Sequence, residues 1–91
     1  YGKTKGGRDL VAVKFSDNVK SIENEPQLMI TSATHGDELI TVEVLLNVME
    51  GMLNEYGKDP RVTDLINKKE IFFIPVVNPD GFSKQDRYEN W

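Results

Sequence analysis

The residues in this chain best suited to chemistry lie in the short stretch Thr34-His35-Gly36-Asp37-Glu38. His35 is the only histidine, and Glu38 follows it by three positions, where an apolar segment gives way to a long helical pattern. An imidazole nitrogen and a carboxylate oxygen are two members of a common catalytic zinc set. The alternative is a solvated helix N-terminus at which Asp37 and Glu38 complement the helix dipole. Residue types and spacing leave both interpretations open, because short motifs match by chance.

Two strands and a long helix would position this stretch. Residues 10–15 alternate between two faces, with Val11, Val13 and Phe15 on one side and Lys14 opposed, which indicates a strand. Residues 27–33 predict a second strand that is apolar on both faces, as in the interior of an α/β sheet. The turn-rich residues 16–26 favour a hairpin-like return that places the second strand beside the first. Residues 38–56 carry a wide apolar stripe at helical spacing, and Gly57 is suited to ending that helix.

A second helix and a third strand complete the pattern. Asp59-Pro60 is typical of an N-cap and first helical position, and we expect this helix to run to about residue 66. Residues 71–77 predict a strand that is apolar on both faces, with its pairing interrupted at Pro75 because proline lacks a ladder donor. The Asn-Pro-Asp-Gly sequence of residues 78–81 predicts a turn directly after that strand.

The order of these elements predicts an α/β fold with a mixed sheet. A strand–helix–helix–strand crossover of this length implies two parallel strands with the helices on one face. The carboxyl ends of both strands then lie at the same edge, so the His35 turn and the turn at residues 78–81 should be neighbours. Open α/β sheets usually carry their chemistry at that edge.

Composition excludes several classes of protein. With 91 residues the chain is one small domain or a piece of a larger one, and its start at Tyr1 favours a piece. The absence of cysteine excludes disulfides, cysteine-ligated metals and a thiol nucleophile. A net charge of −4 without a basic block argues against a nucleic-acid partner. The apolar runs fall short of the ~20 residues that a membrane span needs.

Taken in order, these features resemble the zinc carboxypeptidases of the M14 type. The matching features are His-x-x-Glu after a strand, the long apolar helix, residues 56–63, and Asn-Pro-Asp-Gly after the next strand. Residues 3–10 also resemble the family's approach to its first strand, so that the resemblance covers residues 2–87. It implies a zinc-carboxypeptidase-like fold of which residues 1–91 are the N-terminal portion, roughly the first third of a single catalytic domain.

The resemblance implies a zinc-dependent hydrolase that removes C-terminal residues from peptides. His35 and Glu38 match the family's first two zinc ligands. The third ligand, the arginine that binds the substrate's terminal carboxylate and the glutamate that activates water have no counterpart here. We therefore expect Zn²⁺, a peptide substrate and the remainder of the same catalytic domain as partners, with residues 1–91 inactive alone. The resemblance also favours a secreted or periplasmic protein.

Arg87 and Asp37 bear on the substrate. Members that act on cell-wall peptides place an oxyanion-stabilising arginine six residues after the turn glycine, and Arg87 has this spacing from Gly81. Pancreatic-type members place it directly after a tryptophan, which here would follow Trp91. Arg87 is otherwise a solvated loop cation. Asp37 stands where pancreatic-type members often carry arginine, and an anion there would not attract a peptide carboxylate.

Three other functions are compatible with the motifs. The first is a cell-wall peptide (murein) carboxypeptidase or amidase of the same fold. The second is an aspartoacylase-like zinc amidohydrolase, which shares the His-x-x-Glu pair but resembles the chain less after the helix. The third is a catalytically dead module that binds peptides.

Overall fold

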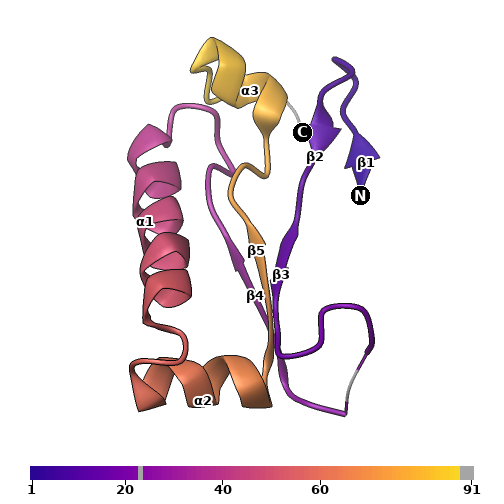
Figure 1. The fold of residues 1–91 in the computed structure, drawn as a ribbon. Coiled ribbons are helices and arrows are strands. Elements are labelled where there is room, and N and C mark those ends of the chain that lie inside the picture. The colour runs from indigo at the N-terminus through magenta and orange to yellow at the C-terminus, as the bar shows by residue number, and fades with distance from the viewer. Residues whose placement is uncertain (23, 89–91) are drawn as a thin grey trace.

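A computed structural model describes residues 1–22 and 24–88. Its elements, shown in Figure 1, are β1 (Gly2–Lys3), β2 (Asp9–Leu10), β3 (Val13–Phe15), β4 (Gln27–Thr31), α1 (Leu39–Glu55), α2 (Pro60–Lys68), β5 (Glu70–Ile74) and α3 (Pro79–Lys84). The long helix α1 runs alongside the sheet, α2 crosses near one end of the sheet, and α3 lies near the other end beside β1 and β2 (Figure 1). The strands and helices predicted from the sequence are therefore present, with changes in their bounds and pairing.

The main sheet has three strands in the order β3-β5-β4. Strand β5 pairs parallel to β4, as the crossover predicts, and antiparallel to β3. The predicted hairpin that would set the second strand beside the first is wrong, because β5 lies between β3 and β4. Ile71 and Phe73 of β5 are only 1% and 0% exposed, so the strand with the most deeply buried side chains takes the centre of the sheet.

The strand predicted over residues 10–15 is divided in two. Strand β2 pairs with β1 in a small separate antiparallel sheet, and β3 alone joins the main sheet. Val11, expected on the buried face with Val13 and Phe15, lies between the two strands and is 55% exposed. The alternating pattern identified the strand that enters the core. It could not show that the chain joins the main sheet only at residue 13.

Helices α1 and α2 begin and end close to the predicted positions. Asp59 caps α2 by accepting a hydrogen bond from the Arg61 amide, and Pro60 occupies the first turn. Gly57 follows the C-cap of α1 with φ of 84°, a left-handed conformation that glycine adopts without a steric cost. Within residues 1–22 and 24–88, no helix combines the length and apolar character needed to cross a membrane.

The core lies between the helices and one face of the sheet. Its buried members come from both helices and from β3 and β5: Phe15, Leu45, Ile66, Ile71 and Phe73. The rings of Phe15 and Phe73 meet edge to face with centroids 4.9 Å apart. Because α1 and α2 contribute to one cluster, the prediction that the helices cover the same face of the sheet is confirmed.

The prediction that β4 is covered on both faces is wrong for the described residues. Met29 of β4 is 65% exposed, and an apolar groove between β4 and α1 is lined by Ile30, Val44 and Val48 among others. Strand β4 has only one neighbour, β5, in the described sheet. The apolar pattern therefore marks surface that the described part of the chain leaves open.

Strand β5 ends before Pro75, as the loss of a ladder donor predicts. The expected turn at residues 78–81 continues into a short helix, α3, that the sequence reasoning missed. Asn78 is its N-cap, with a side-chain oxygen that accepts a hydrogen bond from the Gly81 amide, and Pro79 is its first residue. Asparagine followed by proline is a helix-start signal as well as a turn signal, which explains the error.

Candidate functional site

The candidate site lies where the chain leaves β4 and β5. Beyond the regular ladder, the Val77 amide donates to the Ser32 carbonyl at 3.0 Å, and the Asn78 amide donates to the Ala33 carbonyl at 3.1 Å. These bonds extend the alignment of the two strands into the segments that follow them. The turn that contains His35 and the start of α3 are therefore neighbours, as the parallel crossover predicts.

Gly36 brings the two segments into backbone contact. A Cβ atom at this position would lie 2.2 Å from the carbonyl carbon of Gly81 and 2.4 Å from the carbonyl oxygen of Asp86. Real Cβ atoms essentially never approach other atoms so closely, so this buried position admits only glycine in the present arrangement. The glycine between the two candidate ligands thus fixes the distance between the loops that carry the site.

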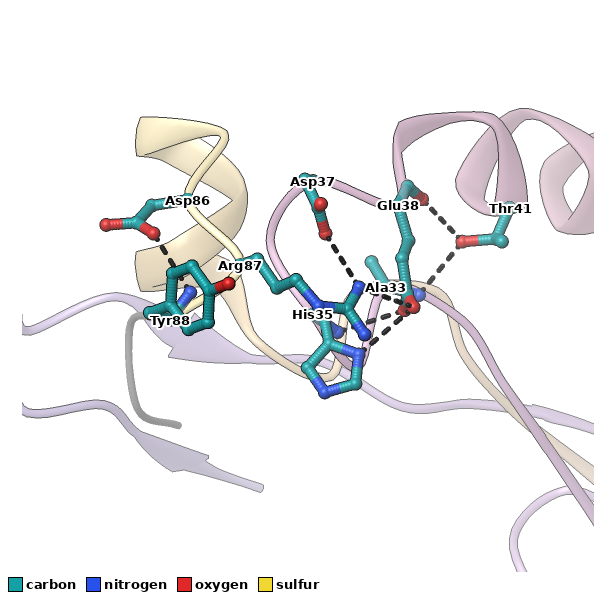
Figure 2. A network of polar contacts seen from close by, with 8 residues as sticks. All are labelled: Ala33, His35, Asp37, Glu38, Thr41, Asp86, Arg87 and Tyr88. Atoms are coloured by element: carbon teal, nitrogen blue, oxygen red, sulfur yellow. Dashed lines mark hydrogen bonds and ion pairs between the residues drawn. The ribbon is translucent and has the colours of Figure 1, made fainter.

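His35 and Glu38 face each other across the turn (Figure 2). The imidazole Nδ1 lies 3.0 Å from Oε2 of Glu38, and the His35 amide donates to Oε1 of the same carboxylate, also at 3.0 Å. Both side chains are 34% exposed, so the pair is accessible without being fully solvated. The two groups singled out by the sequence therefore form one contiguous unit.

Glu38 occupies the N-cap of α1, but its side chain does not cap the helix. A dipole-complementing carboxylate would direct its oxygens at the first amides of the helix. Here the carboxylate instead turns back to the amide and ring of His35. These hydrogen bonds, from the backbone amide first and then from the ring, hold the pKa of Glu38 below its usual value. The carboxylate is kept in its anionic form, as a metal ligand requires.

Thr41 and Ala33 support this turn, and sequence reasoning did not identify either. The Thr41 hydroxyl donates to the Glu38 carbonyl at 2.6 Å and accepts from the Ala33 amide at 3.0 Å (Figure 2). Ala33 is 1% exposed and has φ of 52°, a left-handed conformation that is strained for a residue with a Cβ atom. A hydroxyl three residues after the N-cap could have signalled the first contact, but no sequence signal marks Ala33.

Arg87 reaches the same place from the segment after α3 (Figure 2). Its Nη1 atom lies 3.4 Å from Oδ1 of Asp37 and 3.8 Å from Oε2 of Glu38. About half of the Arg87 and Asp37 side chains is exposed. The structure therefore brings Arg87 beside the His35–Glu38 pair while its side chain stays partly exposed. Sequence reasoning did not predict its pairing with Asp37, and Trp91, which marked the competing interpretation, lies outside the described residues.

Asp80 joins the N-terminal segment to α3. Its carboxylate accepts hydrogen bonds from the Thr4 hydroxyl at 2.7 Å, the Gly6 amide at 3.0 Å and the Arg8 guanidinium at 3.0 Å. The bond from Thr4 contributes most to a pKa of Asp80 below its usual value. Asp80 is only 5% exposed, so these contacts act as a structural anchor that holds α3, and with it the segment that carries Arg87, in place.

The donor set of the pair fits zinc in type and spacing. Zinc bonds of about 2.0–2.2 Å in a tetrahedral site place two ligand atoms about 3.4 Å apart, close to the Nδ1–Oε2 separation of 3.0 Å. Among the described residues no group of three histidine, cysteine, aspartate or glutamate side chains is placed to hold a metal ion. A catalytic zinc site uses three protein ligands, and the donor atoms of His35 and Glu38 could supply two of them.

The fold is shared with a solved structure. The crystal structure of thrombin activatable fibrinolysis inhibitor (TAFI) matches with a TM-score of 0.79 over 91% of this chain and 20% of that chain, at 24% sequence identity. The likeness establishes the fold, a mixed sheet with helices, and confirms the fold class predicted from the order of elements.

The family follows from the sequence comparisons. The family model Peptidase_M14, zinc carboxypeptidase, matches residues 1–91, and the chain belongs to this family. The resemblance stated from the motifs is thereby confirmed.

Similar proteins carry corresponding names. A zinc carboxypeptidase from Saccharothrix mutabilis subsp. capreolus is 41% identical over 80 residues, which are 88% of this chain and 18% of that protein. Carboxypeptidase D from Homo sapiens is 38% identical over 84 residues, 91% of this chain and 6% of that protein. Carboxypeptidase M from Mus musculus is 34% identical over 82 residues, 89% of this chain and 18% of that protein. The chain spans less than a fifth of the length of each.

Proposed function

We propose that residues 1–91 are the N-terminal part of the catalytic domain of a zinc metallocarboxypeptidase, here called the parent enzyme. Family membership over the whole chain and the small share of each relative that it spans support this proposal. The parent enzyme hydrolyses the C-terminal peptide bond of a peptide substrate. We also propose, from the family resemblance, a secreted or periplasmic location.

His35 and Glu38 are the proposed zinc ligands on this segment. The observation that carries the proposal is the 3.0 Å approach of Nδ1 to Oε2, at the edge of the sheet where β4 gives way to α1. The backbone amide of His35 holds the second carboxylate oxygen, so the ligand orientation is set by the turn itself. When bound, zinc polarises a carbonyl group and lowers the pKa of a coordinated water to about 7.

Arg87 is the proposed electrostatic contributor from this segment. Its guanidinium lies beside Glu38, where it can donate hydrogen bonds to an oxygen of the substrate that gains negative charge. By comparison with other oxyanion donors, loss of such a group costs about 3 kcal/mol of transition-state stabilisation. The pair and Arg87 come from segments about fifty residues apart, which Gly36 and the Asn78 amide hold together.

The isolated segment is proposed to be inactive and to bind zinc weakly. Catalytic zinc sites use three protein ligands, and the described residues provide a pair. Calorimetric titration of residues 1–91 with Zn²⁺ tests this, with a dissociation constant well above micromolar expected. Sub-micromolar binding by the native sequence that is lost in His35→Ala would show that the segment holds a complete site.

The function is tested on the parent enzyme with an N-acylated dipeptide that has a free C-terminal carboxylate, and with the same dipeptide amidated at its C-terminus. Release of the C-terminal residue from the free acid, and not from the amide, is expected of a carboxypeptidase. His35→Ala and Glu38→Gln should abolish turnover. Glu43→Gln, on an exposed position of α1, is the matched control and should retain it.

Three results would contradict the proposal. Turnover that survives His35→Ala would remove this residue from the site. Cleavage of a cell-wall peptide by the native parent enzyme, without cleavage of the dipeptide, would favour the murein-directed alternative. A protein that binds the dipeptide without cleaving it, while carrying zinc, would favour the peptide-binding module.

A further inference from the structure

Arg87 is a flexible side chain held at the rim of the candidate site. It follows α3, whose C-cap Gln85 has φ of 53°, and the next amide, that of Asp86, donates to the Gly81 carbonyl at 2.9 Å. The carbonyl of Asp86 in turn packs against Gly36. The backbone next to Arg87 therefore packs directly against the turn that contains His35. The side chain beyond it has several rotatable bonds, so holding it in one place costs conformational entropy.

Two carboxylates compete for this guanidinium. Nη1 lies 3.4 Å from Asp37 and 3.8 Å from Glu38, so both acids lie within ion-pair distance of one nitrogen. Both carboxylate oxygens of Glu38 already contact His35, one at its backbone amide and the other at its ring. Asp37 has no such role, and Arg87 is the partner to which its carboxylate is directed in Figure 2. Asp37 is therefore the carboxylate that remains available to Arg87 when Glu38 binds a metal ion.

We propose that Asp37 is a positioning residue that holds Arg87 at the edge of the metal pair and keeps its guanidinium off Glu38. This inference rests on the proposed function. A partly exposed ion pair contributes little to folding stability, so the pair is poorly suited to a purely stabilising role. Its effect is instead on where the cation sits. With Asp37 in place, the guanidinium is available to substrate oxygens. When Asp37 is replaced by a neutral residue, Glu38 is the carboxylate left within ion-pair distance of Arg87, and the guanidinium pairs with it instead.

A double-mutant cycle on the parent enzyme tests this inference. The four forms are the native protein, Asp37→Asn, Arg87→Gln and the double variant, and the first readout is the zinc dissociation constant measured by competition with a chelator. Asp37→Asn should weaken zinc binding by about two- to fivefold when Arg87 is present, the range that such cycles give for partly exposed pairs. In the Arg87→Gln background the same substitution should change the constant much less, because no cation is left to compete for Glu38.

Catalysis gives the second readout of the cycle. Asp37→Asn should lower kcat/KM for the N-acylated dipeptide about ten- to hundredfold, the loss expected from a misplaced catalytic group. In the Arg87→Gln background, Asp37→Asn should have little further effect on kcat/KM. Equal effects of Asp37→Asn in both backgrounds, including no effect in either, would overturn the inference, because Asp37 would then act through its own charge or not at all.

Failure of this inference can be told apart from failure of the proposed function. Zinc affinity reports on Asp37 and Arg87 even if the parent enzyme does not cleave dipeptides. Conversely, turnover retained in His35→Ala would reject the proposed function without any measurement on Asp37. If Asp37→Asn does not fold, Asp37→Ser takes its place in the same four-form cycle, with the same expected and contradicting outcomes.

Discussion

Substituting Gly36 by alanine should separate the two loops that build the site. The added Cβ atom would lie 2.2 Å and 2.3 Å from the carbonyl carbon and oxygen of Gly81, and 2.4 Å from the carbonyl oxygen of Asp86. Ordinary van der Waals contacts are 3.4–4 Å, so each approach is about 1 Å too short. All three atoms belong to the backbone, and no side chain can rotate away to relieve the overlap.

The expected cost is therefore at or above the upper end of the range for overpacking, about 1–3 kcal/mol of unfolding free energy. Relief requires a shift of about 1 Å between the His35 turn and the segment that carries Arg87. A displacement of that size at a catalytic site costs about a hundredfold in rate. Gly36→Ala should thus lower both the stability and kcat/KM of the parent enzyme.

The assay combines urea denaturation with dipeptide hydrolysis, and Gly51→Ala is the matched control. Gly51 lies inside α1, and a Cβ atom there meets nothing within 4 Å. Alanine is the better helix former, so this control should leave activity unchanged and raise stability by about 0.5–1 kcal/mol. A Gly36→Ala variant with the stability and activity of the native protein would refute the close packing of the two loops.

Three further predictions concern stability of the parent enzyme. Asp80→Asn should lower the melting temperature at pH 7, because contacts such as that from Thr4 hold the pKa of Asp80 below its usual value. This contribution to stability is present above the unfolded pKa of ~3.9 and is lost as pH falls through the lower folded pKa, so the difference in melting temperature between the metal-free native and variant proteins should shrink as the pH falls below ~3.9. Lys14→Met removes a cation 3.8 Å from the fully buried Glu70 carboxylate and should cost about 1–3 kcal/mol in urea denaturation, whereas an unchanged midpoint would show that the pair contributes nothing. Phe73→Ala at the centre of the core should cost about 3–5 kcal/mol by the same measurement, and a cost below 1 kcal/mol would contradict its burial.

The sequence allowed the site pair and the parallel crossover to be predicted because both depend on local signals. His35 and Glu38 stand at a change from strand to helix periodicity, and the crossover length dictates parallel pairing. The turn after β5 was identified from Asn78 and Pro79, although its helical continuation was not. These inferences required only the order and spacing of residues within each element.

The contacts between distant segments could not be predicted in the same way. The pairing of Asp37 with Arg87 and the backbone contact at Gly36 depend on how two loops pack, which no local pattern encodes. The central position of β5 was also missed, because no pattern within a strand shows which other strands it pairs with. The left-handed conformation of Ala33 is imposed by tertiary hydrogen bonds against the preference of alanine.

The most direct test of the central claim is an anomalous difference map from crystals of the parent enzyme, collected on both sides of the zinc absorption edge. The account predicts a zinc peak bonded to Nδ1 of His35 and to the Glu38 carboxylate at about 2.0–2.2 Å. A zinc ion bound elsewhere, with the His35 and Glu38 side chains turned away from each other, would contradict it.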